Sequence, residues 1–327
     1  MPECRACQNR ENLELVIAKE MFLGTREKFK YFICPSCSSL SIGEIPKNLA
    51  ELYSKYPIFD LNPVKMGFWK RFARRYTLLN KNALASLTLK YLDSWEDLAF
   101  RALHGLGLNL STKILDVGCG SGILVGILNS FGFKDITGID PYLSETVEQP
   151  GLRLIKGTVM NLNEQFDLVM CNHSFEHVED ASLTAKKLET LVKPGGWLII
   201  RLPNIESYSF KKYRENWHGI HAPFHLVLPS LEGMKNIFHK TDLVLQERRQ
   251  EQLVELFLYN IDYSLNIGLT EPLGVLTCLG DGPLGNKIPP LFTKREIVFL
   301  KDKVKAVIES KVADYIAYYY KKNEAVF

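Results

Sequence analysis

The 327-residue sequence has no long apolar run and no strong charge imbalance. Apolar runs such as LVELFLY are too short to span a bilayer as a helix, and the polar N-terminus, MPECRACQNRENLE, has no secretory signal core. The formal net charge of +3 does not demand a nucleic acid or an anionic membrane as partner. Internal repeats and low-complexity segments are also missing. We therefore expect a soluble, cytoplasmic protein without a transmembrane segment, long enough for two domains.

Cysteine is sparse outside the N-terminal region. Cys119, Cys171 and Cys278 are scattered through apolar contexts, which is not the pattern of a disulfide framework. The other cysteines form two Cys-x2-Cys pairs, Cys4 with Cys7 and Cys34 with Cys37. Two thiolate pairs on two turns can close a tetrahedral Zn²⁺ site, and with all four positions taken by cysteine the zinc should be structural. Residues 1–45 are therefore predicted to be a zinc-ribbon-like domain, with unrelated thiols or redox pairs as the alternatives.

Segments of strand and helix character alternate from residue 113 onward. Strands are expected at 113–118, 135–140, 151–157, 166–172, 195–203 and 242–250, and helices at 121–132, 182–193 and 230–241. This order predicts a doubly wound α/β sheet in a core domain at 111–250. Residues 46–110 have helical spacing and are expected to form a linker or substrate cap.

The C-terminal residues 251–327 are expected to be a helical extension. A capping box of Thr293 and Glu296 predicts a helix through about residue 318. The last five residues, NEAVF, are expected to add a closing edge strand.

A glycine-rich turn follows the first core strand, in the order Asp116, Gly118, Gly120, Gly122. Glycines at alternate positions let the backbone approach a ligand closely. Asp140 ends the second strand, where a carboxylate can bind ribose hydroxyls. A carboxylate at Asp116 would repel a pyrophosphate but would suit an ammonium and a sulfonium. The pattern therefore favours S-adenosylmethionine (SAM) over NAD.

The segments KILDVGCGSG, GIDPY, FDLVMCNHSFEHVED and LVKPGGWLIIRLPN resemble the successive motifs of class I SAM-dependent methyltransferases. The resemblance implies a Rossmann-like, seven-stranded sheet with an antiparallel last strand. It places Asp116 and the three glycines at the methionine end of SAM and Asp140 at the ribose. It further assigns cofactor contacts to Pro141, Tyr142, Thr158, Val159 and Asn172.

Three histidines follow the fifth strand in NWHGIHAPFH: His218, His221 and His225. Pro223 argues against one continuous helix through them, and so against a regular helical metal face. Methyl transfer often needs a base, and histidine has a suitable pKa. PFHLVLPSLEGMKNIF resembles a segment of sugar C-methyltransferases in which a histidine is the base, and His225 occupies that position. His173, after the fourth strand, is the second candidate base.

The resemblance implies a small-molecule acceptor that is methylated on oxygen or nitrogen. A sugar nucleotide or a glycan precursor is the first candidate. The pair Glu176-His177 also fits this subfamily, with a structural role favoured for His177. Two alternatives stay open: an RNA methyltransferase that uses the ribbon to grip RNA, and a non-enzymatic, zinc-bearing scaffold. Positive and negative residues nearly balance in the ribbon, which argues against RNA.

Overall fold

The computed structural model describes residues 2–55, 67–82, 84–85, 100–251, 259–260, 263–264, 266 and 313–324. The predicted capping box at Thr293 and Glu296, and Cys278, lie outside these residues. In the described part of the chain, no helix is both long enough and apolar enough to cross a membrane.

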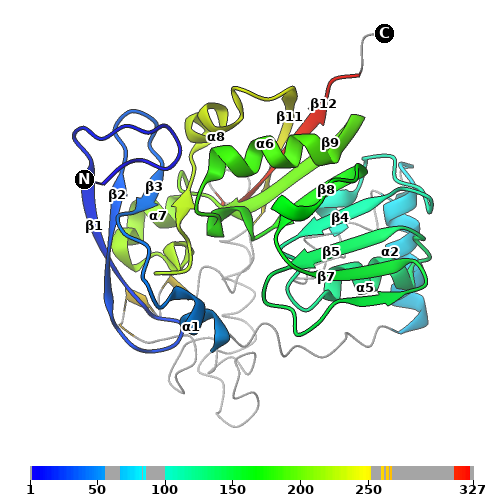
Figure 1. Ribbon diagram of the computed structural model, residues 1–327, viewed down its shortest axis with the longest axis horizontal. Coiled ribbons are helices and arrows are strands. Elements are labelled where there is room, and N and C mark those ends of the chain that lie inside the picture. Colours follow the sequence, from blue (N-terminus) through cyan, green and yellow to red (C-terminus); the bar gives the residue numbers. More distant parts are fainter. Residues whose placement is uncertain are drawn as a thin grey trace.

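A mixed eight-stranded sheet forms the core (Figure 1). Its strands are β4 (Ile114–Val117), β5 (Ile136–Asp140), β6 (Val147–Gln149), β7 (Leu152–Lys156), β8 (Phe166–Asn172), β9 (Val192–Pro203), β11 (Leu243–Glu251) and β12 (Tyr315–Lys322). The order is β11-β12-β9-β8-β4-β5-β7-β6. Strand β12 is antiparallel to both neighbours, and β4, β5, β7, β8 and β9 are parallel. The predicted Rossmann-like sheet with an antiparallel last strand is confirmed, and the short β6 adds an eighth strand at the edge.

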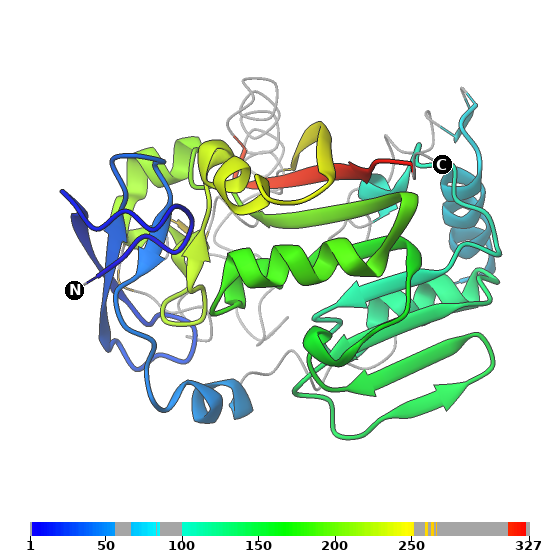
Figure 2. The same cartoon turned by 45° about the horizontal axis from the view of Figure 1, so that its top comes forward.

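Both faces of the sheet are covered, which explains why its strands read as continuous apolar runs. Leu168 and Met170 of β8 face a cluster that includes α5 (Ile123–Ser130), whereas Val169 and Cys171 face α6 (Ala181–Leu191). Helix α6 crosses one face of the sheet, with α8 (Leu231–Phe238) beside it (Figure 2). Helix α2 (Phe68–Leu79) belongs to the α5 side. Strand β5 lies on one side of β4 and β8 on the other, so the strand order reverses at β4. Open α/β sheets bind ligands at the carboxyl ends of the strands where the order reverses, so a ligand site is expected at the end of β4.

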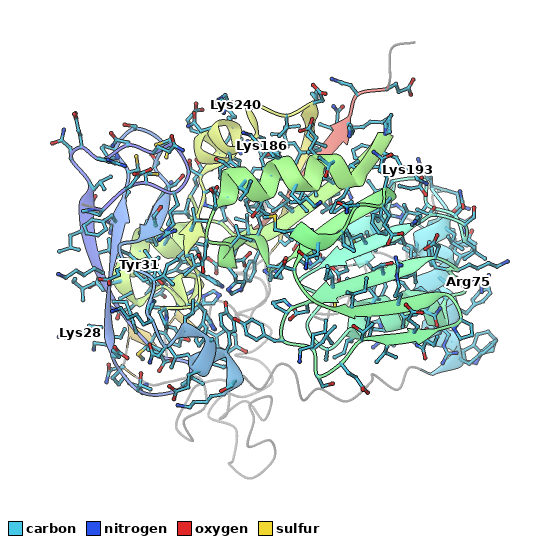
Figure 3. The ribbon with its side chains drawn as sticks, in the orientation of Figure 1. Lys28, Tyr31, Arg75, Lys186, Lys193 and Lys240 are labelled. Carbon is cyan, nitrogen blue, oxygen red and sulfur yellow. The ribbon has the colours of Figure 1, made fainter. Side chains whose placement is uncertain are left out.

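The N-terminal unit has a sheet of its own, in the order β1-β2-β3-β10. It consists of β1 (Glu14–Lys19), β2 (Lys28–Ile33), β3 (Leu40–Ile42) and β10 (Val227–Leu228). Strand β10 comes from the segment that carries the three histidines and pairs with β3. Tyr31 of β2 (labelled in Figure 3) donates a hydrogen bond to the carbonyl of His225 at 2.9 Å. The unit therefore holds the histidine segment in place, a connection that no local pattern predicted.

The C-terminal prediction is wrong in two respects. Residues from Tyr315 onward form strand β12, not the end of a helix, because the run YIAYYY is rich in β-forming residues. The last strand precedes NEAVF and lies between β9 and β11, so it is not at an edge. Asn323 and Glu324 follow the strand as coil, and residues 325–327 lie outside the described part.

Candidate active site

The loop between β4 and α5 is built on three glycines with positive φ. The angle is 72° at Gly118, 56° at Gly120 and 81° at Gly122, a region that other residues rarely adopt. A Cβ at Gly118 would lie 2.3 Å from the Cβ of Ser174, whereas one at Gly120 would meet no atom within 4 Å. Close packing therefore requires Gly118. Gly120 leaves open space at the N-terminus of α5, where unpaired N–H groups can meet a ligand.

Asp140 closes this loop from the end of β5. Its Oδ2 accepts a hydrogen bond from the Gly120 N–H at 3.0 Å, and its Oδ1 accepts one from the Tyr142 N–H at 2.8 Å. Burial raises the pKa of Asp140, and these two backbone donors oppose that shift. An ionised carboxylate offers about four acceptor sites, so about two stay available to ribose hydroxyls. The residues therefore fit the predicted ribose contact.

Asp116 lies on β4 and is almost fully buried. Asn172 donates to Asp116 Oδ1 at 2.9 Å, and the side-chain oxygen of Asn172 accepts from Arg201 Nη1 at 3.1 Å. Burial raises the pKa of Asp116 to about 7, although the Asn172 hydrogen bond and the Arg201 charge lower it. A buried carboxylate that ionises near neutral pH would gain most from a cationic ligand, which fits the ammonium and sulfonium of SAM.

The titration of Asp116 predicts that SAM affinity depends on pH. Affinity should fall as the pH drops through about 7, because the carboxyl takes up a proton and loses its attraction for the cationic groups. At about pH 5 the loss should approach roughly 100-fold if SAM keeps Asp116 ionised. Calorimetric titration between about pH 5 and pH 8 measures the profile, which Asp116→Asn should flatten. A constant wild-type affinity over this range would contradict the prediction.

The residues assigned to the adenine end differ in their exposure. Pro141, Tyr142 and Thr158 are exposed, and Val159 is buried. Tyr53, from the short helix α1 (Leu49–Ser54), stacks on Tyr142 with ring centroids 4.6 Å apart. Sequence reasoning missed Tyr53, because it reaches the site from a segment without a recognisable motif.

Glu176 brings the two candidate bases together. It lies in a 3₁₀ turn (Phe175–His177) directly after β8 and is fully buried. Its Oε1 lies 3.8 Å from Nδ1 of His173 and 3.8 Å from Nε2 of His225. Ligand atoms of Glu176, His177 and His225 all lie within 4.8 Å of one another. The two candidate bases, which are 52 positions apart in the sequence, thus share one site, in which the glutamate had no predicted role.

Both candidate bases are neutral at neutral pH. Burial, with a smaller effect from the Arg201 charge, lowers the pKa of His173 to about 3. Burial, followed by the neighbouring His177, holds the pKa of His225 well below its ordinary value. The side chain of His173 is 27% exposed and that of His225 only 10%. The His173 side chain is therefore the more exposed of the two, with its Nε2 buried and its Nδ1 toward Glu176.

The prediction that no continuous helix runs through the three histidines is confirmed. A 3₁₀ turn covers His218–Ile220, a cis peptide bond joins Ala222 to Pro223, and β10 follows. His218 pairs with Asn260 at 3.0 Å, and the ring of His221 stacks on that of His225 at 5.1 Å. Only His225 of the three lies against Glu176.

The four N-terminal cysteines converge on one point. The sulfurs of Cys4 and Cys37 are 3.5 Å apart, as are those of Cys7 and Cys34, so neither pair is a disulfide. All four sulfurs lie within 4.8 Å of one another. Tetrahedral ligands at the usual Zn–S distance lie about 3.8 Å apart, so the cluster fits the predicted zinc.

The central part of the chain is similar to known methyltransferases. Residues 88–248 match the family model described as a methyltransferase domain. The chain is 34% identical over 112 residues to the ubiquinone biosynthesis O-methyltransferase of Albidiferax ferrireducens, covering 30% of this chain and 44% of that protein. It is 29% identical over 165 residues to the protein of the same name from Azorhizobium caulinodans, covering 47% and 56%. The chain thus spans about half the length of these curated relatives.

Solved structures also align with the chain at low sequence identity. The cyclopropane synthase MmaA2 from Mycobacterium tuberculosis aligns with a TM-score of 0.43 and 16% identity, over 81% of this chain and 95% of that one. The plantazolicin methyltransferase BpumL in complex with SAH aligns with a TM-score of 0.39 and 13% identity, over 85% and 90%. The predicted class is confirmed: residues 88–248 match a methyltransferase domain, and the described strands β4 to β12 form a Rossmann-like sheet.

Proposed function

We propose that the chain transfers a methyl group from SAM to a hydroxyl group of a small molecule. The observation that carries the proposal is the pair of acidic residues, Asp116 and Asp140, that flank the open glycine loop. One suits the cationic methionine end, and the other can accept hydrogen bonds from ribose. When bound, SAM supplies an electrophilic methyl group. The relatives named O-methyltransferases support oxygen as the acceptor atom.

His173 is the group we propose to accept the acceptor's proton. Its neutral ring lies at the carboxyl end of β8 and is partly accessible. His225 is the alternative base, but its ring is more buried and faces Glu176. A sugar nucleotide or glycan precursor is the acceptor class that we propose to test first. The expected location of the protein is the cytoplasm. Zn²⁺ at the four cysteines would be structural, since no ligand position there is left for a substrate.

Asp140→Ala tests the cofactor. The variant should bind SAM roughly 100-fold more weakly than the wild type, because two charge-assisted hydrogen bonds are lost. Calorimetric titration of SAM, and of its demethylated product, into the zinc-loaded chain measures this loss. Asp135→Ala is the matched control, because Asp135 is exposed just before the other end of β5 and should leave affinity unchanged.

Failure of the wild type to bind either ligand would overturn the proposal and favour the scaffold alternative. If SAM binds, transfer of a labelled methyl group to sugar nucleotides, phenols and RNA identifies the acceptor. Labelling of RNA alone would replace the small-molecule proposal.

A further inference from the structure

A second cluster of metal-ligand side chains lies beside the proposed SAM site. Glu176, His177 and His225 meet within 4.8 Å, far in sequence from the four cysteines. Both carboxyl oxygens of Glu176 are buried and make no hydrogen bond among the described residues. A buried carboxyl without a partner is costly, and such groups in proteins usually bind a proton donor or a cation.

A backbone carbonyl determines which nitrogen of the His225 ring can bind a cation. Nδ1 of His225 lies 2.8 Å from the carbonyl oxygen of Gly219, and Nδ1 of His177 lies 2.9 Å from that of Phe224. A carbonyl oxygen only accepts, so Nδ1 of His225 carries the hydrogen and its neutral ring has the lone pair on Nε2. Nδ1 of His177 is shared between the Phe224 carbonyl and the Tyr53 hydroxyl, whose oxygen lies nearer at 2.7 Å. The hydrogen bond of His225 to a carbonyl is the arrangement that metal-binding histidines usually make.

Glu176 and His225 therefore face each other with acceptor atoms only. Nε2 of His225 faces Oε1 of Glu176 at 3.8 Å, which is too long for a hydrogen bond between them. Ligand atoms about 2.1 Å from a tetrahedral zinc lie about 3.4 Å apart, so this pair is already close to the spacing of two zinc ligands. A shared cation satisfies both the lone pair of His225 and the carboxylate, whereas a single proton cannot bridge the observed distance.

We propose that Glu176, His177 and His225 form a second divalent-cation site, for Zn²⁺ or Mn²⁺. Two histidines and one carboxylate are a common ligand set for first-row cations. Three protein ligands leave coordination positions open, which distinguishes this site from the closed four-cysteine cluster. The half-buried His177 gives one side of the cluster access to solvent.

The cation would activate the acceptor hydroxyl in the proposed methyl transfer. This role rests on the proposed function, whereas the metal site itself does not. An acceptor hydroxyl bound at an open position would lose its proton more readily, because the cation acts as a Lewis acid. The oxygen then forms a bond to the methyl carbon as the carbon–sulfur bond of SAM breaks. The hydroxyl proton passes to His173, and SAM leaves as its neutral thioether. An acceptor with a hydroxyl beside a second oxygen ligand would fit best.

Zinc content tests the site without any acceptor or SAM. After dialysis into metal-free buffer, the wild-type chain should keep two zinc ions, and Glu176→Gln should keep one. His225→Gln, which can preserve the hydrogen bond to the Gly219 carbonyl, should also keep one and serves if Glu176→Gln does not fold. His239→Gln, an exposed histidine on the same domain, should keep two.

Mn²⁺ titration followed by electron paramagnetic resonance supplies the second readout. Mn²⁺ prefers oxygen and nitrogen ligands to thiolates. It should therefore occupy this cluster in a sample that keeps zinc at the four cysteines but has lost the second zinc. Binding of one Mn²⁺ that is lost in Glu176→Gln supports the site. The proposal is overturned if the wild type binds neither a second Zn²⁺ nor Mn²⁺, or if Glu176→Gln and His225→Gln retain both ions.

Discussion

Removal of the metal from the four cysteines should unfold the N-terminal unit and release the segment that carries His225. Structural zinc sites in small domains bind with about 10–16 kcal/mol, and that free energy is largely folding free energy. The unit contributes only short strands, and its buried sulfurs pack in the same cluster as Met234 of α8. Strand β10 and the Tyr31 hydrogen bond attach His225 to the unit. Loss of the metal should therefore also displace His225 from Glu176.

Hydrogen exchange with a zinc chelator, read at residues 14–42 and 217–228, measures this effect. Both segments should lose protection together, while β4 and β8 keep theirs. Cys34→Ala should reproduce the result without a chelator, and Cys119→Ala is the control, because Cys119 lies outside the cluster. Protection of residues 217–228 that survives the loss of zinc would contradict the prediction.

The sequence predicted the features that depend on local pattern. The alternating strands and helices, the glycine turn and the strand-end residues Asp116 and Asp140 need only their own segment to be recognised. The paired cysteines were equally visible, because metal ligands have fixed spacing. These features account for strands β4, β5, β7, β8 and β9 and for the cofactor side of the candidate site.

The features that the sequence did not predict depend on contacts between distant segments. Strand β12 inserts between β9 and β11, and that pairing has no local signal. The same is true of β10, of Tyr53 on Tyr142, and of Glu176 between its histidines. The pair Glu176-His177 was noticed, but only the fold shows that His225 completes the cluster.

Glu251→Gln should destabilise the chain by about 3–5 kcal/mol. Glu251 accepts hydrogen bonds from Arg201 Nε and Nη2, the shortest at 2.7 Å, and the two side chains are only 7% and 4% exposed. Removal of one partner leaves a buried, uncompensated charge on Arg201. Urea unfolding measures the loss. Lys193→Gln breaks the half-exposed pair with Asp167 (Lys193 is labelled in Figure 3) and should cost less than about 1 kcal/mol.

The double variant Arg201→Met with Glu251→Leu separates stability from cofactor binding. Two apolar side chains of similar size remove both charges, so most of the lost stability should return. SAM affinity should stay roughly 10-fold or more below wild type, because Asn172 loses its donor and Asp116 loses the positive charge that lowers its pKa. Recovery of both quantities would show that Arg201 serves only the fold. Recovery of stability alone would show that the buried pair is kept because it holds Asn172 and Asp116 ready for a cation.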